Sequence, residues 1–264
     1  MLDFSGKTVL VVGGTSGINR GVAELFASQG ARVAVASRSE DKVADTIRAL
    51  ESLGSEAAGF SADVRDAEAI EAGIAGICDR FGPLDVVVSG AAGNFPALAN
   101  QLSANGFKSV MDIDLLGTFH VMKSVFPYLK KPGASVINIS APQAFIPMMA
   151  QIHVCAAKAG VDMITRTLAL EWGQAGVRVN SVVPGPIDGT EGMARLAPTE
   201  TIRKKVVDGV PLGRFGTPED IGNACLFLAS DLAGFVTGAI IPVDGGWAQN
   251  SCGGMSDYLG SLVS

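Results

Sequence analysis

The feature that most constrains the fold is a regular alternation of short runs, most of them apolar along their whole length, with longer amphipathic segments. The apolar runs have the length of strands and are rich in β-branched residues, without the polar alternation of a half-exposed strand. Such runs are typical of parallel strands covered by helices on both faces of the sheet. We expect strands at Thr8–Val12, Arg32–Ala36, Ala57–Ser61, Leu84–Ser89, Ser135–Ser140, Arg178–Val183 and Ala239–Val243.

The segments between these runs have helical periodicity. Asp66 and Thr217 stand where N-caps belong, and Pro218 follows at a first helical position. Alternating strands and helices imply right-handed βαβ units, so we predict a doubly wound, Rossmann-type α/β sheet of about seven strands in a single domain spanning residues 1–264. The expected helices are Gly17–Gln29, Glu40–Leu53, Ala67–Phe81, Gly106–Leu129, Gln151–Gly176 and Pro218–Ser230.

Charge and composition narrow the classes of partner. The net charge of −6 argues against nucleic acid or an anionic membrane as a partner. No apolar run approaches the ~18 residues of a transmembrane helix. No metal site is expected, because the only histidines lack ligand spacing and the cysteines form no Cys-x-x-Cys pair. The start resembles no secretory signal and the end, SCGGMSDYLGSLVS, no peroxisomal address, so we expect a cytoplasmic protein.

A glycine-rich turn stands between the first expected strand and the first expected helix. Gly13, Gly14 and Gly17 lie in VLVVGGTSGIN. Glycines there let the backbone approach a pyrophosphate, and the helix start offers free N–H groups and the positive end of its dipole. The context of strand, turn and helix predicts a dinucleotide site.

The end of the second expected strand indicates which dinucleotide is bound. Sites for NAD usually place an acidic residue there, against the ribose 2′-hydroxyl. This chain has Ser37 and Arg38 instead. A carboxylate would repel a 2′-phosphate, whereas a hydroxyl and a guanidinium would bind it, so NADPH is expected.

Several motifs, in order along nearly the whole chain, resemble the short-chain dehydrogenase/reductase family. They are the glycine turn, SADV (61–64), SGAAG (89–93), Lys158 in its helix, VNSVVPGPI (179–187) and TGAIIPVDGG (237–246). The resemblance implies a homotetramer joined through the long helices near 106–129 and 151–176. It also implies cofactor contacts by Gly13, Ser16, Gly17, Ile18, Arg38, Asp63, Val64, Ala91, Lys158, Pro184 and Ile187, with Thr190 near the carboxamide.

The chain departs from this family where the chemistry is done. The usual tetrad is Asn, Ser, Tyr and Lys, and only Lys158 remains. Asp114 stands at the asparagine position, Ala141 at the serine position and Val154 at the tyrosine position, and the third glycine of the turn is Asn19. Hydride delivery to a ketone needs an acid to protonate the alkoxide as it forms, and neither Ala141 nor Val154 carries one.

A conjugated C=C bond makes a smaller demand on the site. Hydride added at its far end spreads the charge into an enolate, which needs hydrogen bonds at oxygen and a later proton at carbon. The sequence therefore favours reduction of a C=C bond next to a thioester. AAGNF (91–95), MDID (111–114), VDMITRTLALEWG (161–173) and PGPIDGTEGMARL (184–196) resemble 2,4-dienoyl-CoA reductases of the peroxisomal type.

That second resemblance assigns roles to individual residues. It implies an acyl-CoA substrate, NADPH as reductant, central parts for Lys158 and Asp114, and an Asp244 that helps to order a water. Asp114 acts as a general acid, orients a water or serves as a structural cap. His153 points either into the cleft or toward a subunit interface. Gln143 stands where the mitochondrial type has its tyrosine, so that mechanism does not carry over.

Other polar residues have weaker interpretations. Asn94 lies on a loop near the expected cleft, and Asp162 is expected on the helix surface or at a subunit contact. Two alternatives remain: a carbonyl reductase with a substitute donor such as His153 or Asp114, and a non-catalytic NADP(H)-binding protein. Cations that could receive the phosphates of coenzyme A are Lys108, Arg195, Arg203, Lys204 and Lys205.

Overall fold

The computed structural model describes residues 2–252. Most of the C-terminal sequence that was compared with a peroxisomal address, residues 253–264, lies outside the described residues. Its centre is one seven-stranded sheet in the order β3-β2-β1-β4-β5-β6-β7, parallel at every pairing. The predicted parallel sheet is therefore confirmed. The strands are β1 (Thr8–Val12), β2 (Arg32–Ser37), β3 (Ala57–Ser61), β4 (Val86–Ser89), β5 (Ser135–Ile139), β6 (Arg178–Pro184) and β7 (Ile240–Val243).

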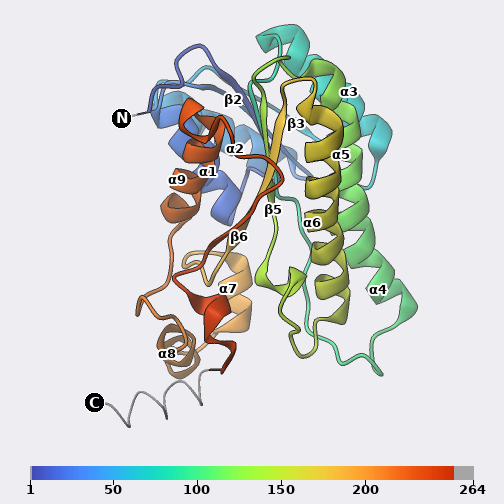
Figure 1. Ribbon diagram of the computed structural model, residues 1–264, viewed down its shortest axis with the longest axis vertical. Coiled ribbons are helices and arrows are strands. Elements are labelled where there is room, and N and C mark those ends of the chain that lie inside the picture. The colour runs from blue at the N-terminus through green and yellow to red at the C-terminus, as the bar shows by residue number, and fades with distance from the viewer. Residues whose placement is uncertain (1, 253–264) are drawn as a thin grey trace.

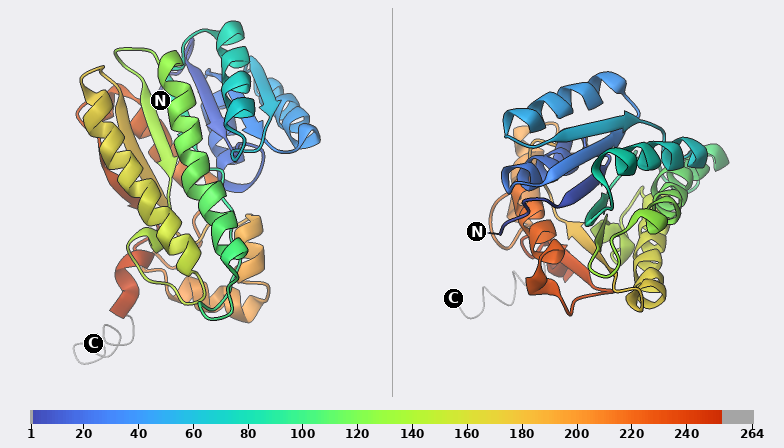
Figure 2. Two further views of the ribbon diagram at one scale, coloured as in Figure 1. Left: turned by 90° about the vertical axis from the view of Figure 1, so that its right-hand side faces the viewer. Right: turned by 90° about the horizontal axis from the view of Figure 1, so that it is seen from above.

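Helices cover both faces of the sheet, as Figures 1 and 2 show. One face carries α1 (Gly17–Ser28), α2 (Glu40–Ser52) and α9 (Pro218–Ala229); the other carries α3 (Ala67–Phe81), α5 (Gly117–Val125) and α6 (Ile152–Gly173). The short helices α4 (Ala104–Val110), α7 (Glu191–Leu196) and α8 (Glu200–Asp208) lie with the loops at one end of the molecule.

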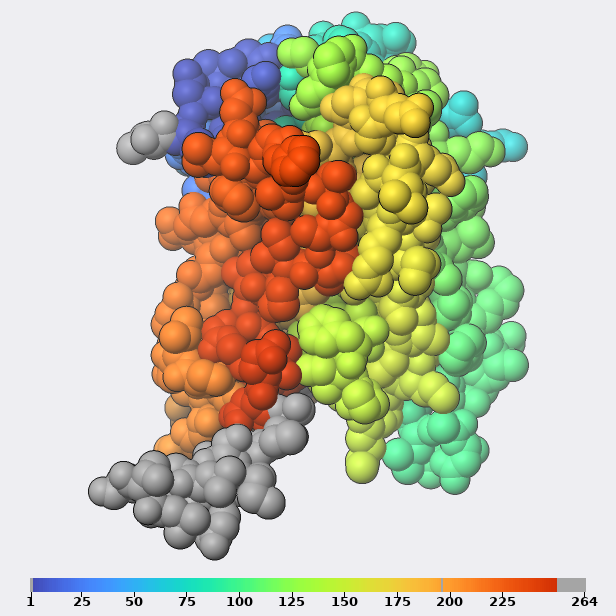
Figure 3. All heavy atoms as spheres, viewed as in Figure 1, coloured from blue at the N-terminus to red at the C-terminus, as the bar shows by residue number. Residues whose placement is uncertain are grey.

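The alternation of side chains along β1 explains why the sheet needs two layers of helices. Val9 and Val11 pack into the core beneath α1 and α9, while Leu10 and Val12 pack into the core beneath α3 and α5. Successive residues of a strand face opposite sides, so a strand that is apolar throughout must be buried on both. A Cβ on Gly238 would lie 3.4 Å from the Cβ of Ala169, so the segment before β7 packs against α6. Figure 3 shows these two stretches of the chain, orange-red and yellow, side by side on one face of the molecule.

The prediction of one continuous helix over residues 106–129 is wrong. The segment forms α4, a π-helical turn η1 (Met111–Leu116), α5 and a 3₁₀ turn η2 (Phe126–Tyr128). Single π turns inside helices are rare and are frequent at functional sites. Helices α7 and α8 lie in a stretch where no helix was expected. No helix among residues 2–252 is long and apolar enough to cross a membrane.

The strand order fixes where a ligand can bind. β1 lies between β2 and β4, so the chain crosses to the other side of the sheet at this point, and the carboxyl ends of β1 and β4 open a crevice. Ligands of open α/β sheets bind in this position. The glycine turn follows β1, and the SGAAG segment begins in β4 and runs on from its end.

Candidate active site

The glycine turn has the geometry of a pyrophosphate cradle. Gly13 has φ 78°, and a Cβ there would lie 3.0 Å from the backbone N of Ala91 in the loop after β4. Ser16 is the N-cap of α1, yet its side chain makes no capping hydrogen bond, and the first turn of α1 holds no acid. The N-terminus of α1 thus offers unpaired donors and the positive end of its dipole, which fits a dinucleotide phosphate.

Asn19, at the position of the family's third glycine, has a structural role. It is 7% exposed, and its Nδ2 donates to the carbonyl of Gly90 at 2.9 Å. A Cβ on Gly90 would lie 2.4 Å from that nitrogen, so glycine at 90 makes room for the larger residue at 19. The asparagine therefore ties α1 to the loop after β4 and leaves the cradle intact.

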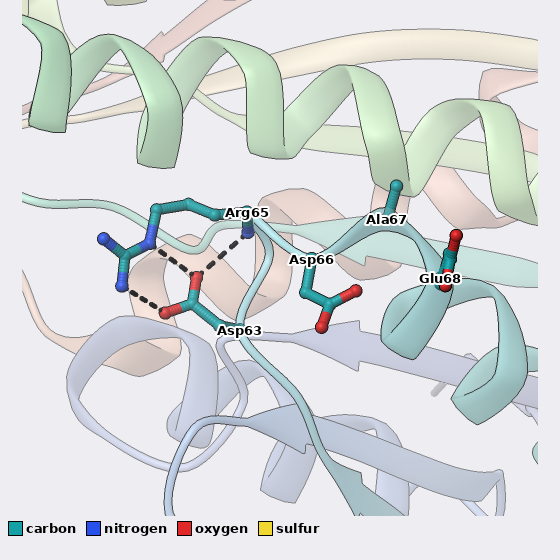
Figure 4. A pocket seen from close by; sticks show the side chains of 5 residues that line it. All are labelled: Asp63, Arg65, Asp66, Ala67 and Glu68. Carbon is teal, nitrogen blue, oxygen red and sulfur yellow. Dashed lines mark hydrogen bonds and ion pairs between the residues drawn. The ribbon is translucent and has the colours of Figure 1, made fainter.

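The expected adenosine end lies at the ends of β2 and β3. The hydroxyl of Ser37 is buried without a partner, and Arg38 is exposed beside it. Asp63 accepts three hydrogen bonds from Arg65, including one at 2.6 Å to Nη2, and this guanidinium holds the pKa of Asp63 below its usual value (Figure 4). A hollow of about 630 Å³ opens between these two residues and the start of α3.

The remaining cofactor candidates line the same crevice. Val64 is buried and its carbonyl is hydrogen-bonded to His120 Nδ1 at 2.8 Å. Pro184 ends β6, and Ile187 is 3% exposed in the loop that follows. Thr190 caps α7, and its Cγ2 lies 3.5 Å from the place of a Cβ on Gly17. The loop after β6 therefore reaches the glycine turn, as a nicotinamide site requires.

Lys158 and Asp114 form a buried pair at the centre of the site. Lys158 is 6% exposed and Asp114 1%, and their Nζ and Oδ2 atoms lie 3.6 Å apart. Lys158 Nζ also donates to the carbonyl of Ile139 at the end of β5. Lysine has three ammonium hydrogens, so two remain for ribose hydroxyls or a water.

Asp114 lies in the π turn and is buried, an environment that disfavours the ionised form of its carboxyl group. Its Oδ1 accepts the backbone N–H of Gly93 at 2.7 Å, while Oδ2 has no hydrogen-bond donor. Burial raises the pKa of Asp114 above its usual value, and the charge of Lys158 partly opposes that shift. Burial thus favours the protonated form of Asp114 more than solvent would, while the neighbouring Lys158 acts against that preference.

His153 points into the protein, not toward solvent. It is fully buried, and its ring centroid lies 4.6 Å from that of Phe95. Neither ring nitrogen has a partner among the described residues. Since a side chain buried within its own chain cannot contact a second subunit, the expected alternative of a subunit interface is wrong, and the contribution of His153 to the cleft stays a prediction. Val154, which stands at the family's tyrosine position, is also buried, in an apolar cluster with Val110 and Ala157. This position therefore supplies no hydroxyl group to the site.

Two other aspartates have surroundings that the sequence did not indicate. Asp244 uses both carboxylate oxygens to cap backbone, accepting from Gly246 N and Ala248 N at 2.9 and 2.8 Å. Its part in ordering a water stays a prediction. Asp162 is 3% exposed and lies near Ser140 and Ser181, so its expected place on the helix surface is wrong. Burial raises its pKa as well.

The cations suggested for coenzyme A are mostly paired. Lys108 binds Asp112, Arg195 binds Glu191 and Lys204 binds Asp208, each within one helical turn. Arg203 reaches Asp188 at 2.7 Å, and Lys205 forms no ion pair with any residue in the 2–252 range. An incoming phosphate would have to compete with these exposed carboxylates, which hold their partners only weakly.

Comparison with known proteins agrees with this geometry. The family profile described as Enoyl-(Acyl carrier protein) reductase matches residues 12–248. A peroxisomal 2,4-dienoyl-CoA reductase, (3E)-enoyl-CoA-producing, from Arabidopsis thaliana is 43% identical over 251 residues, covering 91% of this chain and 84% of that protein. The chain belongs to the short-chain dehydrogenase/reductase family. It is accordingly an oxidoreductase.

Two further members of the family extend the likeness. A probable 2,4-dienoyl-CoA reductase from Bacillus subtilis, (2E)-enoyl-CoA-producing, is 37% identical and covers 91% of this chain and 96% of that protein. The structure of an actinorhodin polyketide ketoreductase variant with NADPH superposes with a TM-score of 0.87 at 29% identity, over 94% of this chain and 99% of that one. The family's fold implies a nicotinamide cofactor, and the cradle described above fits one.

Sequence reasoning missed one residue beside this site. Gln151 directly precedes α6 and is 2% exposed, with its side-chain amide hydrogen-bonded to both Asn94 and Gln143. A lone glutamine before a helix gives no recognisable signal in sequence. Only the meeting of three loops in space reveals it.

Proposed function

We propose that the protein reduces 2,4-dienoyl-CoA thioesters with NADPH as the hydride donor. The observation that carries this proposal is the buried Asp114–Lys158 pair in a site whose tyrosine and serine positions hold Val154 and Ala141. A site without a hydroxyl acid is poorly suited to a ketone and well suited to a bond whose added electrons are delocalised into a thioester. The names of the two reductase relatives support the same substrate class.

The residues would divide the reaction between binding and proton transfer. When bound, the nicotinamide supplies a hydride to the far end of the diene. Lys158 would hold the ribose hydroxyls, and its charge favours the dienolate that results. Asp114, with its raised pKa, would then supply a proton to carbon, directly or through a water. Protonation next to the thioester carbonyl gives the 3-enoyl product, and protonation two carbons further gives the 2-enoyl product.

NADPH is proposed as the cofactor from the end of β2. The unpaired hydroxyl of Ser37 and the exposed guanidinium of Arg38 stand where a 2′-phosphate would lie, with no carboxylate at that strand end. Asp63, after the end of β3, is close enough for the charge of Arg38 to act on it, and the ion pair with Arg65 offsets the charge of this carboxylate. The NADPH seen in the ketoreductase structure supports this choice.

We propose a homotetramer in the cytoplasm, from an exposed apolar face on the helices and from the free cysteine thiols. Leu116, Phe119 and Met163 expose 42, 50 and 57% of their area along α5, η1 and α6. An apolar face of this kind on two helices fits a second copy of the chain, and a homotetramer follows from two such contacts. Three described cysteines are free thiols, which suits the reducing cytoplasm.

One assay separates this function from its alternatives. NADPH oxidation is followed with 2,4-hexadienoyl-CoA, crotonyl-CoA and acetoacetyl-CoA in parallel, and the product is identified by NMR. Turnover of the dienoyl thioester alone is expected. Turnover of acetoacetyl-CoA would instead indicate a carbonyl reductase with a substitute donor, and tight NADPH binding without turnover would indicate a binding protein.

A further inference from the structure

A second buried acid, Asp162, stands next to the lysine of the site. Asp162 follows Lys158 by four residues on α6, so the two side chains are neighbours on the helix surface. Asp162 is 3% exposed and Lys158 6%. Lys158 donates to the carbonyl of Ile139 at the end of β5, and the next residue, Ser140, has its hydroxyl beside Asp162. The lysine therefore has one buried carboxyl group in the π turn and another on its own helix.

A chain of hydrogen bonds beneath α6 ends at Asp162. Asn138 Nδ2 donates to Thr165 Oγ1 at 2.9 Å, and Thr165 Oγ1 lies 2.8 Å from Ser181 Oγ. Thr165 Oγ1 also lies 3.1 Å from the carbonyl of Val161, the longer of the two contacts in which it could donate, so we assign its single hydrogen to Ser181. The hydrogen of Ser181 is then left for Asp162, and the donors of the chain all point toward this carboxyl group.

Ser140 brings a second hydroxyl to the same carboxyl group. Its Oγ and Asp162 Oδ1 are both buried, and neither has a hydrogen-bond partner among residues 2–252. A serine hydroxyl rotates to suit its partner, and an ionised carboxyl group only accepts hydrogen bonds. Burial raises the pKa of Asp162, and the hydroxyls of Ser140 and Ser181 oppose that shift. These two donors favour the ionised form of Asp162.

The cations that act on Asp162 come from its own helix. Lys158 lies one turn before it and Arg166, at an exposed position, one turn after it. Both charges oppose the rise in the pKa of Asp162 that burial causes. β5 and β7 carry no charged residue, and Arg178 at the start of β6 is bound to backbone carbonyl groups. Asp162 therefore has two hydroxyl donors and two cations for one negative charge.

Asp114 has fewer groups that favour its charge. Its Oδ1 accepts one N–H, from Gly93, and its Oδ2 has no donor in the described part of the chain. The titratable neighbours that act on it are Lys158 and His153. Because one lysine stands between two buried acids, these groups titrate together, and a single proton on the two acids makes the cluster of three neutral. The surroundings favour that proton on Asp114 and the negative charge on Asp162.

We propose that Asp162 is a positioning residue that stays ionised next to Lys158 and so lets Asp114 keep the proton that the reaction consumes. This role rests on the proposed function, because the proton is the one delivered to the substrate carbon. Once Asp114 has released it, both acids are charged beside one lysine, and the like charge of Asp162 favours the return of a proton from solvent to Asp114. Asp162 acts through its charge and touches no reacting atom.

Removal of this charge should move the pH profile of the reaction without abolishing the reaction. Asp162→Asn keeps the shape of the side chain and leaves Asp114 as the one buried acid beside Lys158. The fall of kcat for 2,4-hexadienoyl-CoA with rising pH should therefore begin about one pH unit lower than in wild type. At the acid end of the profile kcat should equal that of wild type, and so should NADPH affinity. An equal loss of kcat at every pH, with the profile unmoved, is the result of a merely structural role and would overturn the proposal.

Two further variants separate charge from packing. Thr165→Val cuts the hydrogen-bond chain and keeps every charge, so its profile should stay in place. A shift in Thr165→Val as large as that in Asp162→Asn would count against the charge of Asp162. Ser140→Ala removes one donor to Asp162 and should move the profile in the same direction by a smaller amount. If Asp162→Asn does not fold, an unmoved profile in Ser140→Ala overturns the proposal in its place.

A titration of the resting protein makes the test independent of turnover. With aspartate isotope-labelled at the carboxyl carbon, the NMR signal of Asp114 is assigned by its loss in Asp114→Asn. That signal should titrate at lower pH in Asp162→Asn than in wild type. A wild type that reduces no dienoyl thioester would refute the proposed function, whereas identical titration of Asp114 in both proteins would refute this inference alone.

Discussion

Asp114 and Lys158 are one charge pair with two different duties. Lys158 keeps two of its three N–H donors for ligands, whereas burial favours the neutral form of Asp114. Asp114→Asn keeps the shape and the acceptor for the Gly93 N–H but cannot release a proton. We expect turnover to fall about 100-fold with NADPH affinity unchanged, as measured by single-turnover kinetics and fluorescence titration. Asp112→Asn, in the same π turn, is the control, and equal losses in both variants would contradict a special role for Asp114.

The raised pKa of Asp114 also gives the pH dependence a sign. If the protonated carboxyl is the acid, kcat falls as the pH rises through that raised pKa, and the fall vanishes in Asp114→Asn. Stability follows the same direction, because the folded state binds the proton more tightly than the unfolded state does, so the free energy of unfolding decreases as the pH rises through this range. A kcat that rises with pH over this range would show that Asp114 acts as an anion.

Arg38 is the residue on which cofactor preference should depend. Arg38→Gln removes the charge that would face a 2′-phosphate, and a charge-assisted hydrogen bond contributes about 1.5–3 kcal/mol. NADPH affinity should fall by roughly 10- to 100-fold while NADH affinity stays the same, as measured by fluorescence titration of both nucleotides. Arg48→Gln, on the exposed side of α2, should change neither value. Equal losses for NADPH and NADH would place Arg38 away from the phosphate.

At the scale of the element, the sequence predicted what periodicity and capping encode. All seven strands lie within two residues of their expected bounds, because most are apolar along nearly their whole length. The break of the 106–129 segment into α4, a π turn and α5 was not predictable, since Gly117 at the start of α5 is the one glycine at these junctions and a single glycine is tolerated inside a helix. A π turn holds about one residue more than an α-helical turn. Whether that residue is accommodated depends on the packing around Asp114, which the order of apolar and polar residues does not reveal.

The capping box of α9 is an element-scale contribution to stability. Thr217 and Asp220 exchange hydrogen bonds at the start of α9, and Arg214 binds the same carboxylate at 2.7 and 2.9 Å. Since α9 packs tightly on α1, Thr217→Ala should cost about 1 kcal/mol of the free energy of unfolding, measured by urea denaturation. Thr199→Ala removes the equivalent cap of α8, a helix with no buried residue, and should cost clearly less. The reverse order would mean that α9 does not depend on its cap.

At the scale of the whole molecule, the site is formed where the carboxyl ends of several strands come together, and the sequence predicts only part of it. Motifs after β1, β2, β3 and β6 predicted where the cofactor candidates lie, because parallel strands deliver their ends to one edge. The burial of His153 and Asp162 and the amide chain through Gln151 were not predictable. Each depends on the rotation of α6 against the sheet, which its weak amphipathicity leaves undetermined because both sides of that helix carry apolar residues.

The exposed apolar face of α5 and α6 makes the state of assembly testable. A groove of about 570 Å³ there is lined by apolar side chains, with Lys123 and Glu171 at its edge. Two copies related by a two-fold axis could pair these opposite charges while burying the apolar strip. Two such dimers make up the proposed homotetramer, for which we expect light scattering to give a mass four times the 27.0 kDa of the chain. Met163→Glu places a charge in the strip and should halve that mass, whereas Leu53→Glu at the exposed end of α2 should not. A wild type that elutes as a monomer would leave this face for another partner.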